Sequence, residues 1–261
     1  MNRQLAFEQL QAEFSMSTLH KGQARLSVGH DMLDSALGGG LLAKRIHLVR
    51  GDMPSSSATA FTLALVSMVV HQAKEKGPIL WCGPARGGYA GQLFGAGLLE
   101  MGLRPEQFIF VRESHPLRRI AAFEEALSTV GLSAVVNEYG PLYEKPDLWQ
   151  KSARRLQLAC ERGSATAFMI GAAGSACGFE TGWHIQPATH QHISQIDWRP
   201  IWDVQLNHAR GGYAETGQLM WDRRTHTLQA VPDKQAALSQ TSWQHRPYQS
   251  QKQTALWQQA S

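Results

Sequence analysis

Short apolar segments alternate with longer segments of helical periodicity along most of the chain. The apolar segments are five or six residues long, which predicts buried strands at residues 46–50, 78–83, 108–112, 132–137 and 165–170. Helical spacing of the apolar positions between them predicts helices over residues 58–70, 89–101, 116–130 and 147–162. Because strands joined by helices usually pair in parallel, this alternation predicts an α/β fold with a mostly parallel sheet flanked by helices.

Two of the predicted helices indicate how the sheet is covered. Residues 58–70 are apolar on nearly every side, so this helix should be buried on more than one side. Residues 116–130 instead place their apolar side chains on one face, and Gly131 follows as the predicted C-cap. The residues of that face are Leu117, Ile120, Phe123, Leu127 and Val130.

The pattern changes after Gly171. Short segments rich in apolar residues around residues 183–185, 202–208 and 218–222, with Gly211-Gly212 as a turn, predict antiparallel strands added at the edge of the sheet on its C-terminal side. From Pro232 onward the chain is polar and rich in glutamine, a composition that cannot bury enough surface to order itself.

The ends of the chain complete the predicted organisation. Phe7, Leu10 and Phe14 have helical spacing, which predicts a short N-terminal helix. This helix either packs on its own domain, the slightly favoured interpretation, or docks on a neighbouring molecule. We therefore expect an N-terminal helix and linker at residues 1–24, one domain at residues 25–232, and a disordered polar tail at residues 233–261.

Composition limits the possible functions only weakly. The 261 residues are 43% hydrophobic, and 25 Lys and Arg face 21 Asp and Glu, a mildly basic balance that allows nucleic-acid contact without requiring it. The three cysteines, Cys82, Cys160 and Cys177, lack metal-binding spacing, and the N-terminus lacks the apolar core of a signal peptide. The apolar run at residues 61–70 is shorter than the about 20 residues that a membrane-spanning helix needs. We therefore expect a cytoplasmic protein.

The segment from residue 46 to residue 70 has the strand–loop–helix layout of a P-loop, in which loop amides and a helix N-terminus hold phosphates. The sequence before it, Leu33-Asp-Ser-Ala-Leu-Gly-Gly-Gly-Leu, resembles the RecA recombinase family, which implies a RecA-like P-loop-type core. The motif G-x-x-x-x-G-K-[ST] is incomplete, however. Gly51 fits its first position, but Ser56, Ser57 and Ala58 replace the second Gly, the Lys and the Ser/Thr. Thr59 supplies a hydroxyl only if the loop shifts by one residue.

The carboxylates of a P-loop enzyme are missing as well. The strand at residues 132–137 ends in Asn137 where a Walker-B Asp would help to hold Mg²⁺, and Glu138 comes one residue late. The resemblance to the RecA family implies a catalytic Glu shortly after the second strand, but the matching segment here, Cys82-Gly-Pro-Ala, has no acidic residue. We therefore expect no catalytic residues, no ATP hydrolysis and no cofactor, while weak nucleotide binding without turnover stays open. The favoured alternative is a plain strand-to-helix turn with Ser55 or Ser56 as N-cap.

Other chemistry-bearing residues give weaker signals. His184, His190 and His192 are close in sequence, but no further ligand has metal-binding spacing, so no metal site is predicted. Cys82 has no evident His partner and is expected to be a small buried residue. Basic residues either line a phosphate-binding face or belong to ordinary solvated helix faces: Arg118, Arg119, Lys151, Arg154, Arg155, Arg223 and Arg224.

Several motifs occur in the order found in one bacterial family. After the RecA-like leader and the Gly-Pro of the second strand come Gly102-Leu-Arg-Pro, Phe108-Ile-Phe-Val-Arg, Glu124-Glu-Ala-Leu, Ala134-Val-Val-Asn-Glu, Arg154-Arg-Leu-Gln-Leu-Ala, Trp202-Asp-Val-Gln-Leu-Asn-His-Ala-Arg-Gly-Gly and Trp221-Asp. Over about residues 25–225 this set resembles the ImuA family, the RecA-like accessory proteins of bacterial damage-inducible mutagenesis. The motifs at residues 154–159 and 209–212 contribute most to the resemblance.

The resemblance implies a non-catalytic adaptor of the SOS response. Such a protein supports error-prone translesion DNA synthesis together with a Y-family-like partner, ImuB, and an error-prone DnaE-type polymerase, with RecA and DNA as further expected contacts. The residues expected to bind partners or DNA are Phe7, Leu10, Phe14, Arg118, Arg154 and Arg155, together with Trp243, Tyr248 and Trp257 of the tail. The oligomeric state stays open.

Two other functions remain as alternatives. Relatives have also been described as SulA-like, which implies a cell-division inhibitor that acts on FtsZ. An active RecA-type DNA-dependent ATPase is the third hypothesis, and the missing Lys, Ser/Thr, Asp and Glu count against it.

Overall fold

The computed structural model describes residues 24–52, 56–73, 76–85, 91–138, 146–171, 178–188 and 199–231. The strands in these residues are β1 (Arg25–Leu26), β2 (Leu41–Leu42), β3 (Ile46–Gly51), β4 (Ile79–Gly83), β5 (Phe108–Arg112), β6 (Ala134–Glu138), β7 (Thr166–Gly171), β8 (Thr181–Pro187), β9 (Ile201–Ala209), β10 (Glu215–Asp222) and β11 (Thr227–Ala230). The helices are α2 (Asp31–Ala36), α3 (Ser57–Gln72), α4 (Gly95–Glu100), α5 (Pro116–Ser128), α6 (Pro146–Arg162) and the short 3-10 helix η1 (Pro105–Gln107).

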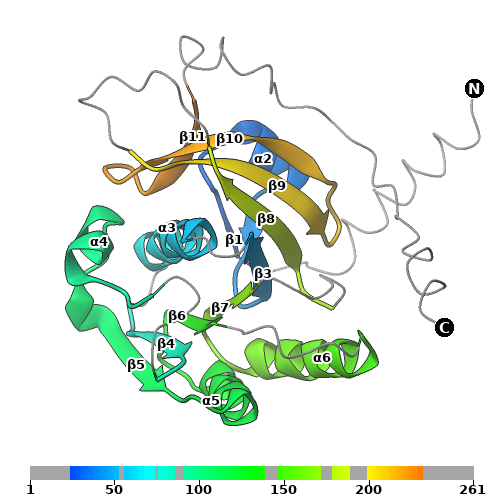
Figure 1. Ribbon diagram of the computed structural model, residues 1–261. Coiled ribbons are helices and arrows are strands. Elements are labelled where there is room, and N and C mark those ends of the chain that lie inside the picture. Colours follow the sequence, from blue (N-terminus) through cyan, green and yellow to red (C-terminus); the bar gives the residue numbers. More distant parts are fainter. Residues whose placement is uncertain are drawn as a thin grey trace, which may run out of the picture.

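Nine of the described strands form a single sheet in the order β11-β10-β9-β8-β3-β7-β6-β4-β5 (Figure 1). In the part of this order that runs β8-β3-β7-β6-β4-β5, each strand is parallel to its neighbours. In the part that runs β11-β10-β9-β8, each strand is antiparallel to its neighbours. The α/β class, the mostly parallel sheet and the antiparallel strands at its C-terminal side are therefore confirmed. β3 lies inside the sheet between β7 and β8, and its Ile46, Leu48 and Val49 are at most 1% exposed.

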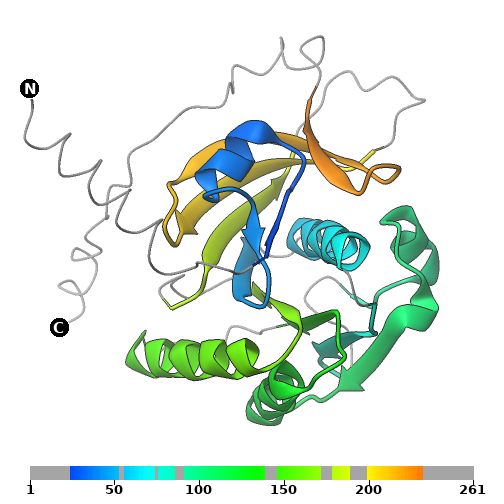
Figure 2. The ribbon, with the colours of Figure 1, turned by 180° about the vertical axis from the view of Figure 1, so that it is seen from behind.

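Helices cover both faces of the parallel strands, α3 one face and α5 with α6 the other (Figures 1 and 2). Val49 packs in the apolar cluster around α3, and Leu48 packs in the cluster around α5 and α6, as the alternation of side chains along a strand requires. The sheet also curves, so that β8 and β11 both contact α3. Phe61 thereby meets Trp183 and Trp202, with ring centroids 5.6 Å and 5.4 Å away. Residues 61–70 are all buried, which confirms the prediction from their apolar sequence.

The glycine-rich leader folds into a small unit made of β1, α2 and β2. Gly38, Gly39 and Gly40 have φ angles of 73°, 106° and 115°, which residues with a side chain rarely adopt. A Cβ on Gly40 would lie only 2.6 Å from the carbonyl oxygen of Leu26. The three glycines therefore let the chain turn back, pair β2 with β1 and enter β3, which gives the leader motif a structural role.

Some details differ from the sequence-based prediction. β8 is not a purely antiparallel edge strand: it is parallel to β3 and antiparallel only to β9, because the chain returns to the amino end of β3 before β8 begins. α5 ends at Ser128, since Thr129 is already extended, and Val130 beyond it is 77% exposed. Leu117, in the first turn of α5, is 60% exposed as well. Only residues 95–100 of the helix predicted over 89–101 are helical among the described residues.

Candidate functional site

The carboxyl ends of β3, β7 and β6 meet at one edge of the sheet, where the P-loop layout predicts phosphate binding. Gly51 ends β3, and Glu138 ends β6 with β7 between them. The register places Asn137 level with Leu48 and Glu138 level with Val49. The two halves of the predicted degenerate site thus lie on the same edge, but the β6 residues lie deeper in the sheet than Gly51.

The start of α3 carries no charged side chain. Ser56 is the N-cap residue and is exposed, but its side chain makes no capping hydrogen bond. Ser57 and Ala58 are buried in the first turn, at 8% and 0% exposure. A Cβ on Gly51 would lie 3.0 Å from the Cβ of Ala58, so the end of β3 packs directly against the helix. Ser55 lies outside the described residues.

Thr59 does not replace the missing hydroxyl of the P-loop motif. Thr59 is 5% exposed, and its Oγ1 is buried with no hydrogen-bond partner among the described residues. A magnesium ion held at the loop would need a hydroxyl that faces the phosphates. The Thr59 side chain therefore belongs to the packed interior of the domain in this conformation.

Asp52 places a negative charge directly after β3. One oxygen of its carboxylate accepts a hydrogen bond from Nε2 of Gln186 at 2.6 Å, and the other lies 3.3 Å from Nε2 of His184. Like charges repel, so a carboxylate here disfavours the binding of a polyphosphate at the same loop. Ser56, Ser57 and Ala58 at the start of α3 supply no positive charge in place of the Lys of the motif.

Asn137 and Glu138 point to opposite faces of the sheet, because successive strand residues alternate. Glu138 shares its face with Val136 and α3, and its Oε1 accepts a hydrogen bond from Nε1 of Trp81 at 2.6 Å. Asn137 faces α5 and α6, where it is fully buried, and its amide atoms have no hydrogen-bond partner among the described residues. Asn137 thus lies on the wrong face to meet a metal ion at the start of α3, and the Glu138 carboxylate is engaged by Trp81.

A buried arginine joins the ends of β5 and β6. Arg119 of α5 is 4% exposed, and its Nε donates to the carbonyl oxygen of Glu138 at 3.0 Å while its Nη1 donates to that of Glu113 at 2.7 Å. These bonds satisfy two carbonyl groups at the strand ends. The sequence-based assignment of Arg119 to an exposed basic face is therefore wrong. Cys82 is buried nearby, as predicted, and burial raises the pKa of its thiol to about 12.

We expect Arg119→Ala to lower the free energy of unfolding by about 3 kcal/mol, because hydrogen bonds to a charged group contribute about 1.5–3 kcal/mol each. Urea denaturation followed by circular dichroism measures the loss. Arg118→Ala is the matched control: this neighbouring residue is exposed, and its replacement should change the stability by less than about 0.5 kcal/mol. Equal losses in the two variants would contradict the structural role of Arg119.

The other predicted binding residues are either exposed or outside the described residues. Arg118 lies exposed on α5, and Arg154 and Arg155 lie exposed on the neighbouring helix α6. Nη2 of Arg155 forms an ion pair with Oε2 of Glu124 at 2.8 Å, which offsets part of the positive charge. The predicted residues outside the described part of the chain are Phe7, Leu10, Phe14, Trp243, Tyr248 and Trp257.

The two motifs that contribute most to the family resemblance lie at the opposite edge, near the amino ends of β3 and β8. Oε1 of Gln157 accepts a hydrogen bond from the backbone N–H of Ile46 at 3.3 Å. The backbone N–H of Arg210 donates to the carbonyl oxygen of Glu180 at 2.9 Å. A Cβ on Gly212 would lie 2.0 Å from the carbonyl oxygen of Ala36, so Gly212 permits close packing on α2. Both motifs therefore hold the fold together.

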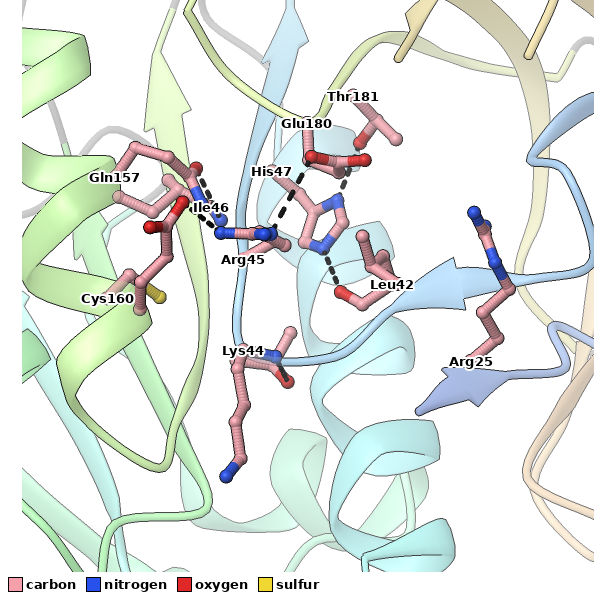
Figure 3. Close-up of polar contacts among 12 residues, drawn as sticks. Arg25, Leu42, Lys44, Arg45, Ile46, His47, Gln157, Cys160, Glu180 and Thr181 are labelled. Atoms are coloured by element: carbon pink, nitrogen blue, oxygen red, sulfur yellow. Dashed lines mark hydrogen bonds and ion pairs between the residues drawn. The ribbon is translucent and has the colours of Figure 1, made fainter. Parts of the chain in front are cut away.

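Arg45 connects the elements of this amino edge (Figure 3). Its side chain is 9% exposed, forms an ion pair with Glu161 of α6, and places Nε 4.0 Å from Oε2 of Glu180. Burial raises the pKa of the Glu180 carboxyl, while the guanidinium groups of Arg210, Arg45 and Arg25 act in the opposite direction. α6, β3 and β8 are thus joined through one buried charge cluster.

His47 forms a second buried network beside Arg45 (Figure 3). Nε1 of Trp183 donates a hydrogen bond to Oγ1 of Thr181 at 2.7 Å. The same Oγ1 lies 2.8 Å from Nδ1 of His47. Nε2 of His47 lies 3.0 Å from the carbonyl oxygen of Leu42, which can only accept, so the ring proton is on Nε2 and Nδ1 accepts from the Thr181 hydroxyl. Burial lowers the pKa of His47 to about 4, so this imidazole is neutral at pH 7.

Sequence reasoning missed Arg45, His47 and Glu180. The available signal was a polar or charged residue at or inside an apolar strand, as in Arg45-Ile-His-Leu-Val and Glu180-Thr-Gly-Trp. Such residues need partners when they are buried. The partners come from segments far away in sequence, which the pattern of a single strand does not identify.

The described residues were also compared with the requirements of metal and membrane sites. Within them, no group of three or more His, Cys, Asp or Glu side chains is arranged to hold a metal ion. His190 and His192 lie outside this part of the chain. None of the helices that the structure describes combines the length and the hydropathy that crossing a bilayer requires.

Comparison with known proteins identifies two relatives, both named Protein ImuA. No family model matches the chain. Protein ImuA of Caulobacter vibrioides strain NA1000 / CB15N is 31% identical over 204 residues, which cover 72% of this chain and 79% of that protein. Protein ImuA of Caulobacter vibrioides strain ATCC 19089 / CIP 103742 / CB 15 matches with the same identity and coverage. The identity extends over most of both sequences, and the chain therefore belongs to the ImuA family.

Proposed function

We propose that this protein is a non-catalytic accessory protein of SOS-induced, error-prone translesion DNA synthesis. It acts in the cytoplasm with a Y-family-like partner, ImuB, and an error-prone DnaE-type polymerase. The observation that carries the proposal is membership of the ImuA family over 79% of the relative's length. The function implied for that family and the residues at the P-loop position support an adaptor role.

The geometry at the carboxyl edge supports a role without catalysis. Ser57 and Ala58 stand at the Lys and Ser/Thr positions of the P-loop motif, and both are buried in the first turn of α3. Asp52 adds a negative charge at the loop, and Asn137 faces away from α3. Phosphoryl transfer depends on positive charge and a bound metal ion at the phosphates, and these residues supply neither.

Three surfaces are proposed to serve the adaptor role. The apolar positions Phe7, Leu10 and Phe14 form a docking segment at the N-terminus, and the aromatic residues of the C-terminal tail act as anchors for a partner. The exposed arginines of α5 and α6 add attraction to DNA or to an acidic partner. That attraction weakens with added salt, because exposed charges are screened.

Deletion of the gene tests this function. We expect a lower frequency of damage-induced mutation and lower survival after ultraviolet irradiation, with normal growth of undamaged cells, because only lesion bypass loses its accessory protein. Mutation to rifampicin resistance measures the first effect. A deletion strain that mutates normally after damage but no longer arrests division would overturn the mutagenesis role in favour of FtsZ inhibition.

We also expect no measurable steady-state ATP hydrolysis by the purified protein, with or without single-stranded DNA. The missing Lys and Ser/Thr of the P-loop motif are the physical reason. A coupled phosphate-release assay measures turnover, with a RecA recombinase as the positive control. Robust turnover that is abolished by substitutions in the Gly51 loop would show that the protein is an enzyme.

A further inference from the structure

The strand β5 forms an exposed edge of the sheet with large apolar side chains. It pairs with β4 on one side and is the last strand in the order of the described sheet. Ile109 is 47% exposed and Phe110 is 41% exposed, and Leu117 of the adjacent α5 is 60% exposed. An edge strand with unprotected apolar residues is a template for pairing with another chain.

The backbone of β5 offers hydrogen-bonding groups on this outer side. The N–H of Glu113, just beyond β5, donates to the carbonyl oxygen of Gly83 at 3.0 Å. Because peptide groups alternate along a parallel strand, Phe110 and Arg112 direct their N–H and C=O groups away from β4. An extended peptide laid along β5 can therefore form ladder bonds with these two residues.

A small hollow of about 30 Å³ beside the edge offers further contacts to such a peptide. Trp81, Leu93 and Phe110 form its apolar walls, and Gln92, Arg112 and Glu138 contribute polar groups. The Glu138 carboxylate is already engaged by Trp81 Nε1, and the Phe110 ring stacks on Phe108 with centroids 5.6 Å apart. The walls are thus held in place within the domain.

The charge at the carboxyl end of β5 indicates the chemistry of the occupant. Arg112 and Arg118 are exposed and form no ion pair with any described residue, and the Arg112 guanidinium lies 5.6 Å from the Phe110 ring centroid. Glu113 is the acidic residue between them, and its Oε1 accepts a hydrogen bond from the N–H of His115. Glu106 lies at the other end of β5, next to Arg104. Arg112 therefore offers an exposed positive charge that attracts a carboxylate of the occupant.

We propose that the β5 edge binds an extended segment of the protein's polymerase-machinery partner, with apolar residues at alternate positions and an adjacent carboxylate. This inference rests on the proposed function and assigns the partner-binding surface. The protein's own tail fits the edge poorly, since after Val231 it contains Lys234, Arg246 and Lys252 but only one acidic residue, Asp233. Nucleic acid has no backbone N–H and C=O groups that could extend the strand ladder, whereas an extended peptide has them.

Binding of the full-length protein to the purified Y-family-like partner tests the proposal. Isothermal titration calorimetry compares the wild type with Arg112→Glu and Ile109→Asp, and we expect each variant to weaken the complex about tenfold. Arg224→Glu is the matched control, because Arg224 is an exposed arginine in the turn between β10 and β11, at the opposite end of the sheet. Hydrogen exchange should show new protection of residues 108–112 in the complex. Melting temperatures verify that the variants are folded.

Each outcome decides between the proposals. Weaker binding by the two edge variants, with wild-type binding by Arg224→Glu and protection at β5, supports the inference. If the wild type binds the partner and both edge variants bind it with the same affinity, the inference is overturned and the proposed function still stands. Loss of self-association alone in Arg112→Glu identifies a second copy as the occupant and also overturns it. Absence of any wild-type complex contradicts the proposed function and the inference together.

Discussion

Arg45→Met should lower the free energy of unfolding by about 3 kcal/mol, because it breaks the ion pair with Glu161 and removes one of the cations that offset the buried charge of Glu180. Arg45 is the cation that both Glu161 and Glu180 face, and Glu180 is 3% exposed. Its loss uncouples α6 from β3 and β8 at the amino edge. Guanidinium chloride denaturation of the purified protein measures the change in midpoint and slope.

A matched exposed pair provides the control for this prediction. Arg155 of α6 pairs with Glu124 of α5 at 2.8 Å, but its side chain is 63% exposed. Arg155→Met should therefore cost less than about 1 kcal/mol, the usual range for surface ion pairs. The double variant Arg45→Met with Glu180→Gln should recover part of the loss, because the buried negative charge is then removed as well. If Arg45→Met and Arg155→Met lowered the free energy of unfolding by similar amounts, burial of Arg45 would not explain its contribution to stability.

Acid should destabilise the wild-type protein more than a His47→Gln variant. Burial lowers the pKa of His47 to about 4, while a histidine in the unfolded chain has a pKa near 6.5. Between these values the unfolded state binds the proton and the folded state does not, so stability is lost as the pH falls through this window. The pKa difference corresponds to about 3 kcal/mol from this one residue.

Denaturation curves at pH 7 and pH 4 for the wild type and His47→Gln measure this contribution. The comparison uses the change between the two pH values, so a uniform loss of stability from the substitution does not affect it. Glutamine can still donate to the Leu42 carbonyl and accept from Thr181, which preserves the polar contacts of the site. His47→Asn serves as a second neutral variant. Parallel losses in all three proteins would show that His47 is not the group that titrates.

The parts of the fold that follow from local periodicity were predictable. The apolar segment at residues 46–50 predicted the strand β3, and the nearly all-apolar segment at residues 58–70 predicted the helix α3. The structure places both in the interior. The direction of β8 was not predictable in this way, because Thr181–Pro187 has the same pattern whether its neighbour is parallel or antiparallel. Pattern identifies which face of a strand is buried, and pairing depends on the path of the connections between strands.

The candidate site likewise has parts that the sequence predicts and parts that only the structure reveals. Gly51 and Glu138 lie on one edge of the sheet, because the carboxyl ends of parallel strands coincide. The opposite directions of the Asn137 and Glu138 side chains also follow from strand alternation. The contacts of Asp52 with His184 and Gln186 join segments more than a hundred residues apart. Only the folded arrangement reveals that His184 and Gln186 contact the Asp52 carboxylate at the loop.

The covering of α3 determines the order in which the domain can mature during synthesis. α3 leaves the ribosome early, whereas Trp183 and Trp202, which pack on Phe61, and the strand β11 belong to the last third of the chain. Until those strands are made, an apolar helix with no polar face has only part of its final covering. Nascent chains that end before β8 are therefore expected to depend on chaperones, and fragments truncated there should aggregate rather than persist as soluble partial domains.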